Sequence, residues 1–141
     1  MHTIGYHYVI EASDCDSEIL KDVNALKKIL LEAARVGKMD VRSTYFYKFS
    51  PQGISGIVVV SGSHISIHTW PEHGYAAIDV YICGTESEPE KTIEYILEQI
   101  KASYAHITEI ERGIKDEEGT YTHVILSWDE APSEEQTETI S

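Results

Sequence analysis

The sequence is poor in cysteine and lacks any long hydrophobic run. The two cysteines, Cys15 and Cys83, do not form a C-x-x-C metal-binding pair, and a disulfide between them is not expected in a reducing compartment. No apolar run is long enough to span a bilayer. The first residues lack a basic stretch followed by an apolar one, so we predict a cytoplasmic protein without a signal peptide.

Basic residues are also scarce, with 11 Lys and Arg against 24 Asp and Glu, for a net charge of −13. A surface of this charge argues against nucleic-acid binding and is compatible with a cationic small substrate. The length and composition are typical of one soluble domain, which we place at residues 1–128. The acidic, aperiodic tail at 129–141 is predicted to be disordered.

The spacing of apolar residues predicts an α/β (α+β) fold. Few strands are joined by helical crossovers, so we expect a two-layer sandwich: a mostly antiparallel sheet with two helices on one face. Strand 54–60 is rich in β-branched residues and is expected to be buried on both faces. Ser87 and Glu90 are expected to form a capping box at the second helix. The helices are predicted at 17–36 and from Ser87 to about Tyr104, and the strands at 2–12, 41–49, 54–60, 63–70, 75–83, 106–112 and 120–128.

The strand at 63–70 carries the main functional signal. Its alternate positions hold His64, Ser66, His68 and Trp70, whereas isoleucines occupy the positions that point the other way. Two histidines on one strand face are costly to bury without partners, so this face is predicted to be a site. His64 could equally be a core histidine satisfied by backbone groups.

The sheet face opposite the helices is predicted to form a dimer interface. If strands 63–70 and 75–83 pair in register, Asp79, Tyr81 and Cys83 share the face of His68 and Ser66. An aromatic and partly apolar face is unfavourable in water, and sheet-on-sheet dimerisation would bury it. A metal site is not favoured, because His64 and His68 lie about 13 Å apart along one strand.

Gly62 and Ser63 contain the parts for self-cleavage. A serine hydroxyl can attack the carbonyl of the preceding residue, and glycine there offers little steric resistance. Elimination and hydrolysis would then leave a pyruvoyl group at residue 63, which is an electron sink like pyridoxal phosphate. His68 is a candidate proton carrier near neutral pH, and Cys83 is a candidate proton donor.

The segment from Phe49 to Gly84 closely resembles the short prokaryotic S-adenosylmethionine decarboxylases. The specific string is Ser63-His64-Ile65-Ser66-Ile67-His68-Thr69-Trp70-Pro71-Glu72, supported by Gly74–Val80 and by Cys83-Gly84. The resemblance implies that Ser63 becomes the pyruvoyl group by cleavage after Gly62, giving a β chain of residues 1–62 and an α chain of residues 63–141. It further implies a homodimer of cleaved protomers, whose product supplies the aminopropyl group for spermidine synthesis.

The same resemblance implies a role for each site residue. His68 and Ser55 would assist processing, and Cys83 would donate the proton in decarboxylation. Phe49 would stack on the adenine of S-adenosylmethionine, and Glu72 would hold the ribose hydroxyls.

The chain departs from the family pattern at two places. Gly62 stands where the family usually has glutamate, and Ala12 and Ser13 stand where it has aromatic residues, one of which covers the adenine. Losing one face of an aromatic sandwich removes about 1 kcal/mol of binding. The first alternative is therefore a pyruvoyl-dependent arginine or ornithine decarboxylase. The second is a non-enzymatic binding protein that stays uncleaved.

Overall fold

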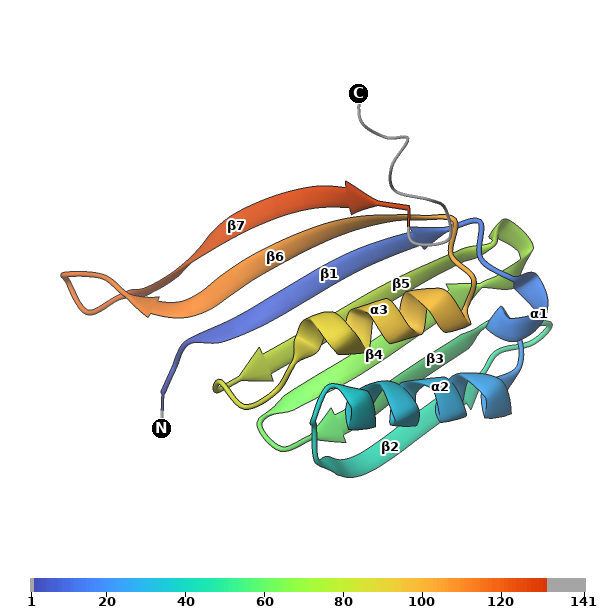
Figure 1. The fold of residues 1–141 in the computed structure, drawn as a ribbon, viewed down its shortest axis with the longest axis horizontal. Helices are drawn as coiled ribbons and strands as arrows, with labels where there is room; N and C mark the ends of the chain where they lie inside the picture. Colours follow the sequence, from blue (N-terminus) through green and yellow to red (C-terminus); the bar gives the residue numbers. More distant parts are fainter. Residues whose placement is uncertain (1, 132–141) are drawn as a thin grey trace.

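A computed structural model describes residues 2–131 as one sheet with helices packed against it (Figure 1). The strands in chain order are β1 (Gly5–Ser13), β2 (Val41–Lys48), β3 (Ile54–Val60), β4 (Ser63–Trp70), β5 (Tyr75–Cys83), β6 (Tyr104–Lys115) and β7 (Tyr121–Glu130). The helices are α1 (Ser17–Leu20), α2 (Val23–Val36) and α3 (Pro89–Gln99), with a single 3-10 turn, η1 (Pro71–His73).

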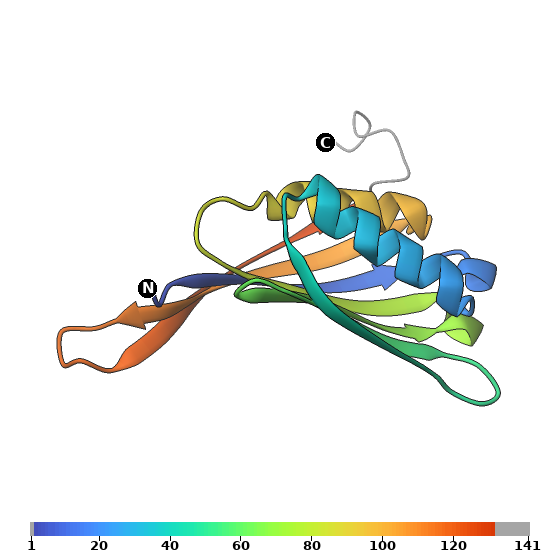
Figure 2. The ribbon, with the colours of Figure 1, turned by 90° about the horizontal axis from the view of Figure 1, so that it is seen from below.

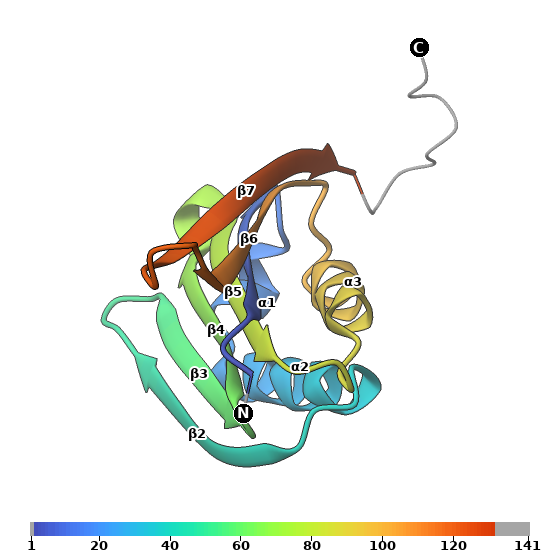
Figure 3. The same ribbon diagram turned by 90° about the vertical axis from the view of Figure 1, so that its left-hand side faces the viewer.

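All neighbouring strands pair antiparallel, in the spatial order β2-β3-β4-β5-β1-β6-β7. The helices α2 and α3 lie side by side on one face and leave the other face open (Figures 2 and 3). This arrangement confirms the predicted two-layer α+β sandwich. Within residues 2–131, no helix is long and apolar enough to cross a membrane.

The core lies between the helices and the covered face of the sheet. Its largest fully buried side chains come from alternate positions of the strands and from the inner sides of the helices. They include Ile10, Leu26, Leu30, Ile65, Ile67, Ile78, Ile96, Leu97 and Ile107. Because the period along a strand is two, this buried set fixes which residues face away from the helices. The open face is therefore determined by the packing of the core.

The single helix predicted at 17–36 was wrong, because a second N-cap, Asp22, divides the segment into α1 and α2. Asp16 accepts hydrogen bonds from the backbone N–H groups of Glu18 and Ile19, which begins α1. Asp22 then accepts from the N–H of Ala25 at 3.0 Å and begins α2. The Ala25 N–H would have bonded to the Lys21 carbonyl in a continuous helix, so the Asp22 cap replaces an internal hydrogen bond at the break.

The helix predicted from Ser87 to about Tyr104 corresponds to α3, which is shorter and starts at a different residue. Its N-cap is Glu88, whose side chain makes no capping bond, so the expected capping box does not form. Ile100 is the C-cap, and Lys101 follows in the left-handed region at φ 59°. This turn lets the chain enter β6 at Tyr104 rather than continue as helix.

Two strand expectations also need correction. β3 is buried on one face only, since Val59 is 38% exposed on the open side. The final strand β7 extends to Glu130, so Asp129 and Glu130 belong to the sheet and not to the tail. The rest of the predicted disordered tail, from 132 to 141, lies outside the described residues.

Buried Thr69, near the end of β4, links the sheet to α1. Its hydroxyl donates to the Leu20 carbonyl at 2.8 Å and accepts from the Ile54 N–H at 3.0 Å. Thr69→Val should destabilise the protein by about 2 kcal/mol, because both backbone groups would stay buried and unpaired. Urea unfolding measures this change, with both chains also carrying Ser63→Ala so that neither can be cleaved at that residue. Thr122→Val on the exposed strand β7 is the control, and an equal loss there would contradict the explanation.

Candidate active site

A two-residue turn between β3 and β4 holds Gly62 and the serine that follows it. Val60 and Ser63 are the last paired residues of the hairpin, so Ser61 and Gly62 form its tip. Gly62 has φ +71°, in the left-handed region that residues with a Cβ rarely adopt. An added Cβ would meet no atom closer than Cys83 Cβ, at 4.0 Å. A side chain at this position would therefore be strained by the backbone conformation and not by lack of space.

Ser63 lies beside Cys83, which ends the neighbouring strand β5. The backbone N–H of Cys83 donates to Ser63 Oγ at 3.1 Å. Both side chains are partly buried, and Cys83 is a free thiol. The other cysteine, Cys15, is buried, and this burial raises the pKa of its thiol to about 12. Cys83 is consequently the more accessible sulfur of the two.

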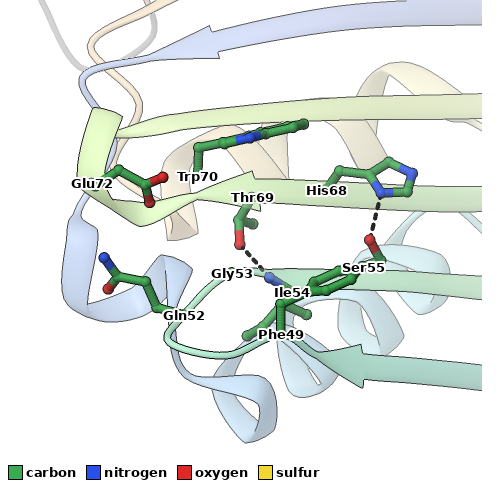
Figure 4. A pocket seen from close by; sticks show the side chains of 9 residues that line it. All are labelled: Phe49, Gln52, Gly53, Ile54, Ser55, His68, Thr69, Trp70 and Glu72. Atoms are coloured by element: carbon green, nitrogen blue, oxygen red, sulfur yellow. Dashed lines mark hydrogen bonds between the residues drawn. The ribbon is translucent and has the colours of Figure 1, made fainter.

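Ser55 and His68 form a second pair, on adjacent strands. They lie directly opposite each other in the β3–β4 register. Ser55 Oγ and His68 Nδ1 are 2.7 Å apart and hydrogen bonded, which orients the imidazole ring (Figure 4). A hydroxyl held against an imidazole is an arrangement suited to proton transfer.

A cavity of about 320 Å³ opens next to this pair, where β3 begins and β4 ends. Figure 4 shows Phe49 entering from the loop after β2, whereas Trp70 and Glu72 lie at the end of β4 and in η1. The size fits a small organic ligand, with aromatic surface for a flat group and a carboxylate for hydroxyls. Its full lining is Phe49, Gln52, Gly53, Ile54, Ser55, His68, Thr69, Trp70 and Glu72.

The predicted site residues therefore form two groups at different ends of the strands. Ser63 and Cys83 lie at one end, and Ser55 and His68 lie with the cavity toward the other. Five positions along β4 separate Ser63 from His68, which corresponds to about 16 Å. Side chains that far apart cannot act on one atom, so one protomer does not assemble the whole predicted constellation.

A polar network lies between the two groups on the open face. Asp79 accepts from Ser66 at 3.1 Å and is hydrogen bonded to His7 Nε2 at 2.9 Å. The bond with His7, followed by that from Ser66, holds the pKa of the Asp79 carboxyl below its usual range. Burial, together with nearby His7, lowers the pKa of His64. The sequence-based prediction that Asp79, Ser66 and His68 share this face agrees with the β4–β5 register.

Gln52 and Trp70 are among the cavity residues to which sequence reasoning gave no binding role. Trp70 stacks on Tyr75 at a centroid distance of 5.1 Å and an interplanar angle of 25°. Trp70 alternates with His68 along β4, and this alternation was the signal in the sequence that could have assigned it to the site. Gln52 lies in a turn between strands and carried no periodic signal.

Position 12 cannot supply a ring to this cavity in the present chain. Ala12 is fully buried on the helix-covered face, opposite Ala76 and Ala105. Ser13, the next residue, is partly exposed at the end of β1.

Fold and site together define a small α+β enzyme class with a serine at a hairpin turn and a cavity at the sheet end. Residues 6–113 match the family model described as S-adenosylmethionine decarboxylase. The chain belongs to this family.

Curated relatives and a solved structure agree with that assignment. The S-adenosylmethionine decarboxylase proenzymes of Pyrococcus furiosus and Thermococcus onnurineus are 59% and 61% identical to it. Each alignment spans 92% of this chain, and 94% and 92% of the relatives. The proenzyme of Caldicellulosiruptor saccharolyticus is 47% identical over 81% of this chain and 92% of its own. The crystal structure of the Aquifex aeolicus adenosylmethionine decarboxylase superposes with a TM-score of 0.76 and 34% identity, covering 85% of this chain and 99% of that one.

The left-handed conformation of Gly62 gives a stability prediction. Gly62→Ala should destabilise the intact chain by about 1 kcal/mol, because an L-residue with a Cβ is strained in this region. Thermal unfolding in the Ser63→Ala background measures the effect without cleavage at the serine. Gly62→Asn should cost less, since asparagine tolerates this region better than alanine. Equal losses for alanine and asparagine would contradict the explanation.

Proposed function

We propose that this chain is a pyruvoyl-dependent S-adenosylmethionine decarboxylase, a carboxy-lyase that cleaves itself between Gly62 and Ser63. The single observation that carries the proposal is the hairpin turn, where Gly62 leads into Ser63 and the Cys83 N–H is directed at the serine oxygen. The product would supply spermidine biosynthesis, and the enzyme would act in the cytoplasm. Cleavage would give a β chain of residues 1–62 and an α chain of residues 63–141.

Processing would start with attack of Ser63 Oγ on the Gly62 carbonyl carbon. The bond from that carbon to the Ser63 nitrogen breaks, the nitrogen takes up the hydroxyl proton, and an ester remains. Loss of the Ser63 α-proton and cleavage of the Cβ–Oγ bond release the Gly62 carboxylate and leave dehydroalanine. Water adds to the imine tautomer of dehydroalanine and ammonia departs, which leaves the pyruvoyl group.

The surroundings of Ser63 fit this chemistry. In the elimination step Oγ departs as part of a carboxylate, and the Cys83 N–H already donates to this atom at 3.1 Å. A preorganised donor directed at an oxygen that gains negative charge lowers the barrier for its departure. Ser55 and His68 of a second protomer would then serve as the groups that move the α-proton, with His68 oriented by the Ser55 hydroxyl.

The pyruvoyl ketone would supply an electron sink for the pair released when the substrate carboxyl group leaves as carbon dioxide. Cys83 would hold the proton that replaces the carboxyl group, in line with its accessible thiol beside residue 63. A proton donor on the protein is required because the departing carbon dioxide leaves a carbanion behind.

The cavity supports S-adenosylmethionine as the substrate. Phe49 and Trp70 offer aromatic surface for the adenine, and the Glu72 carboxylate can accept from the two ribose hydroxyls. Although position 13 has no ring, Trp70 retains aromatic surface on the β4 side of the cavity. Arginine and ornithine have no flat base for these rings to cover.

A homodimer of cleaved protomers would join the two separated groups of residues. In a two-fold sheet-on-sheet dimer, Ser63 and Cys83 of one protomer would face Ser55 and His68 of the other. The open face supports such contact, since it exposes aromatic and apolar side chains that water solvates poorly. Tyr45, Tyr47, Val59 and Trp70 are 65%, 51%, 38% and 41% exposed.

The intact mass of the purified chain under denaturing conditions tests the proposal. We expect two fragments that separate between Gly62 and Ser63, with pyruvoyl in place of serine on the second. Release of carbon dioxide from S-adenosylmethionine, and not from arginine or ornithine, would identify the substrate. One uncleaved chain after long incubation would contradict self-processing and favour a non-enzymatic binding protein.

A further inference from the structure

Tyr81 lies two residues before Cys83 in β5, so both side chains are on the open face of the sheet. Three neighbouring side chains contact the tyrosine ring. Tyr81 lies opposite His7 in β1 and opposite His64 in β4. Its ring stacks on His64 at 5.9 Å and meets the His7 ring edge-on at 5.9 Å. The guanidinium carbon of Arg112 lies 5.3 Å from the centre of the same ring. These contacts hold the ring in one orientation.

The hydroxyl of Tyr81 is directed at the sulfur of Cys83. The thiol lies 3.5 Å from the hydroxyl oxygen and donates to it. The neighbouring Cys83 sulfur, which can accept the hydroxyl proton, followed by burial, raises the pKa of Tyr81. A hydroxyl that both accepts and donates can turn to donate to the sulfur once the thiol has lost its proton.

Gly5 makes room for this contact from the neighbouring strand. A Cβ at Gly5 would lie 2.4 Å from the Tyr81 hydroxyl oxygen and 2.7 Å from the ring carbon that bears it. Gly5 is paired with Cys83 in the β1–β5 register, so the glycine, the tyrosine hydroxyl and the sulfur occupy one small region. Any side chain at position 5 must displace the hydroxyl.

We propose that Tyr81 is a positioning residue for Cys83 that stabilises the thiolate left behind when the thiol gives up its proton. The proposal rests on the function proposed above, in which Cys83 is the proton donor. The proton passes from Sγ to the substrate carbon, the negative charge stays on Sγ, and solvent later restores the proton. Charge-assisted hydrogen bonds are stronger than neutral ones, so the Tyr81 contact strengthens as the charge develops. The Arg112 cation over the ring helps to hold the tyrosine in the orientation that this contact needs.

The first experiment compares Tyr81→Phe with the unsubstituted enzyme. We expect kcat to fall about tenfold with KM unchanged, because the lost hydrogen bond acts on a charge that forms only during the reaction. Self-cleavage into two chains, measured by intact mass, should be unchanged in this variant. Tyr6→Phe is the matched control, since Tyr6 lies on the opposite face of β1 and should retain full activity. An unchanged kcat in Tyr81→Phe would overturn the proposal.

A second variant reaches the same contact without changing a polar group. Gly5→Ala should also lower kcat, because its Cβ displaces the Tyr81 hydroxyl. The double variant Gly5→Ala/Tyr81→Phe should be no slower than the slower single variant, since both remove one interaction. Fully multiplicative losses would show that the two residues act separately and would overturn the proposal.

A third measurement does not depend on enzyme activity. In the Ser63→Ala chain, iodoacetamide should modify Cys83 and spare Cys15, which is 8% exposed. Adding Tyr81→Phe should slow the modification of Cys83 about tenfold at neutral pH, because the thiolate is the nucleophile. Unchanged reactivity in an enzyme that decarboxylates S-adenosylmethionine would overturn the Tyr81 proposal alone. Absence of cleavage and decarboxylation in the unsubstituted chain would instead overturn the proposed function.

Discussion

Replacing Ser63 with alanine should leave the chain in one piece and abolish decarboxylation. Without the Ser63 hydroxyl no attack on the Gly62 carbonyl can begin, and no pyruvoyl group can form. Denaturing mass analysis should show one chain of 15.9 kDa. The release of carbon dioxide from S-adenosylmethionine should fall by more than about 10³-fold.

Ser61→Ala provides the control for this loss. Ser61 occupies the same turn, and its hydroxyl accepts from exposed Arg42 at 2.9 Å. Its replacement should leave both cleavage and decarboxylation intact. Cleavage of the Ser63→Ala chain at this turn would show that another residue is the nucleophile.

Mixing two inactive variants should restore activity if the active site is shared between protomers. In a heterodimer of Ser63→Ala and His68→Ala chains, one composite site has both defects and the other has none. Random pairing then gives about one quarter of the wild-type number of intact sites. The expected result is a rise from near zero to about a quarter of wild-type decarboxylation when the two genes are co-expressed.

The control for this mixture places both defects in one group of residues. Co-expressing Ser63→Ala with Cys83→Ala should restore nothing, because both residues lie at the same end of the strands and serve the same composite site. In every heterodimer each site then retains one defect. Equal restoration in both mixtures, or in neither, would contradict the shared site.

Much of the fold could be predicted from apolar periodicity. Alternation located β4 and β5 and separated the face of His68 from the face of the buried isoleucines, whereas a run of β-branched residues located β3. The helix boundaries were predicted less well. The division at Asp22 depends on a choice between continuing a helix and capping a new one, and that choice is decided by packing as much as by local chemistry.

The buried character of β3 could not be derived from its composition. A run of β-branched residues is equally typical of a strand with one covered face and of a strand covered on both. Here the helices occupy a single side of the sheet, and Val59 stays 38% exposed on the other. The length of β7 was missed because its alternation is weak and it forms an edge of the sheet.

The sequence by itself determined the chemical groups of the site, because a hydroxyl after glycine, an imidazole and a thiol are properties of residues in order. Only the tertiary structure decided how these groups are distributed. Antiparallel pairing brings Ser63 beside Cys83 and Ser55 beside His68. The separation of about 16 Å between the two pairs follows from the rise along β4. Distances between strands depend on register and on which side the core is packed, and neither is encoded in local spacing.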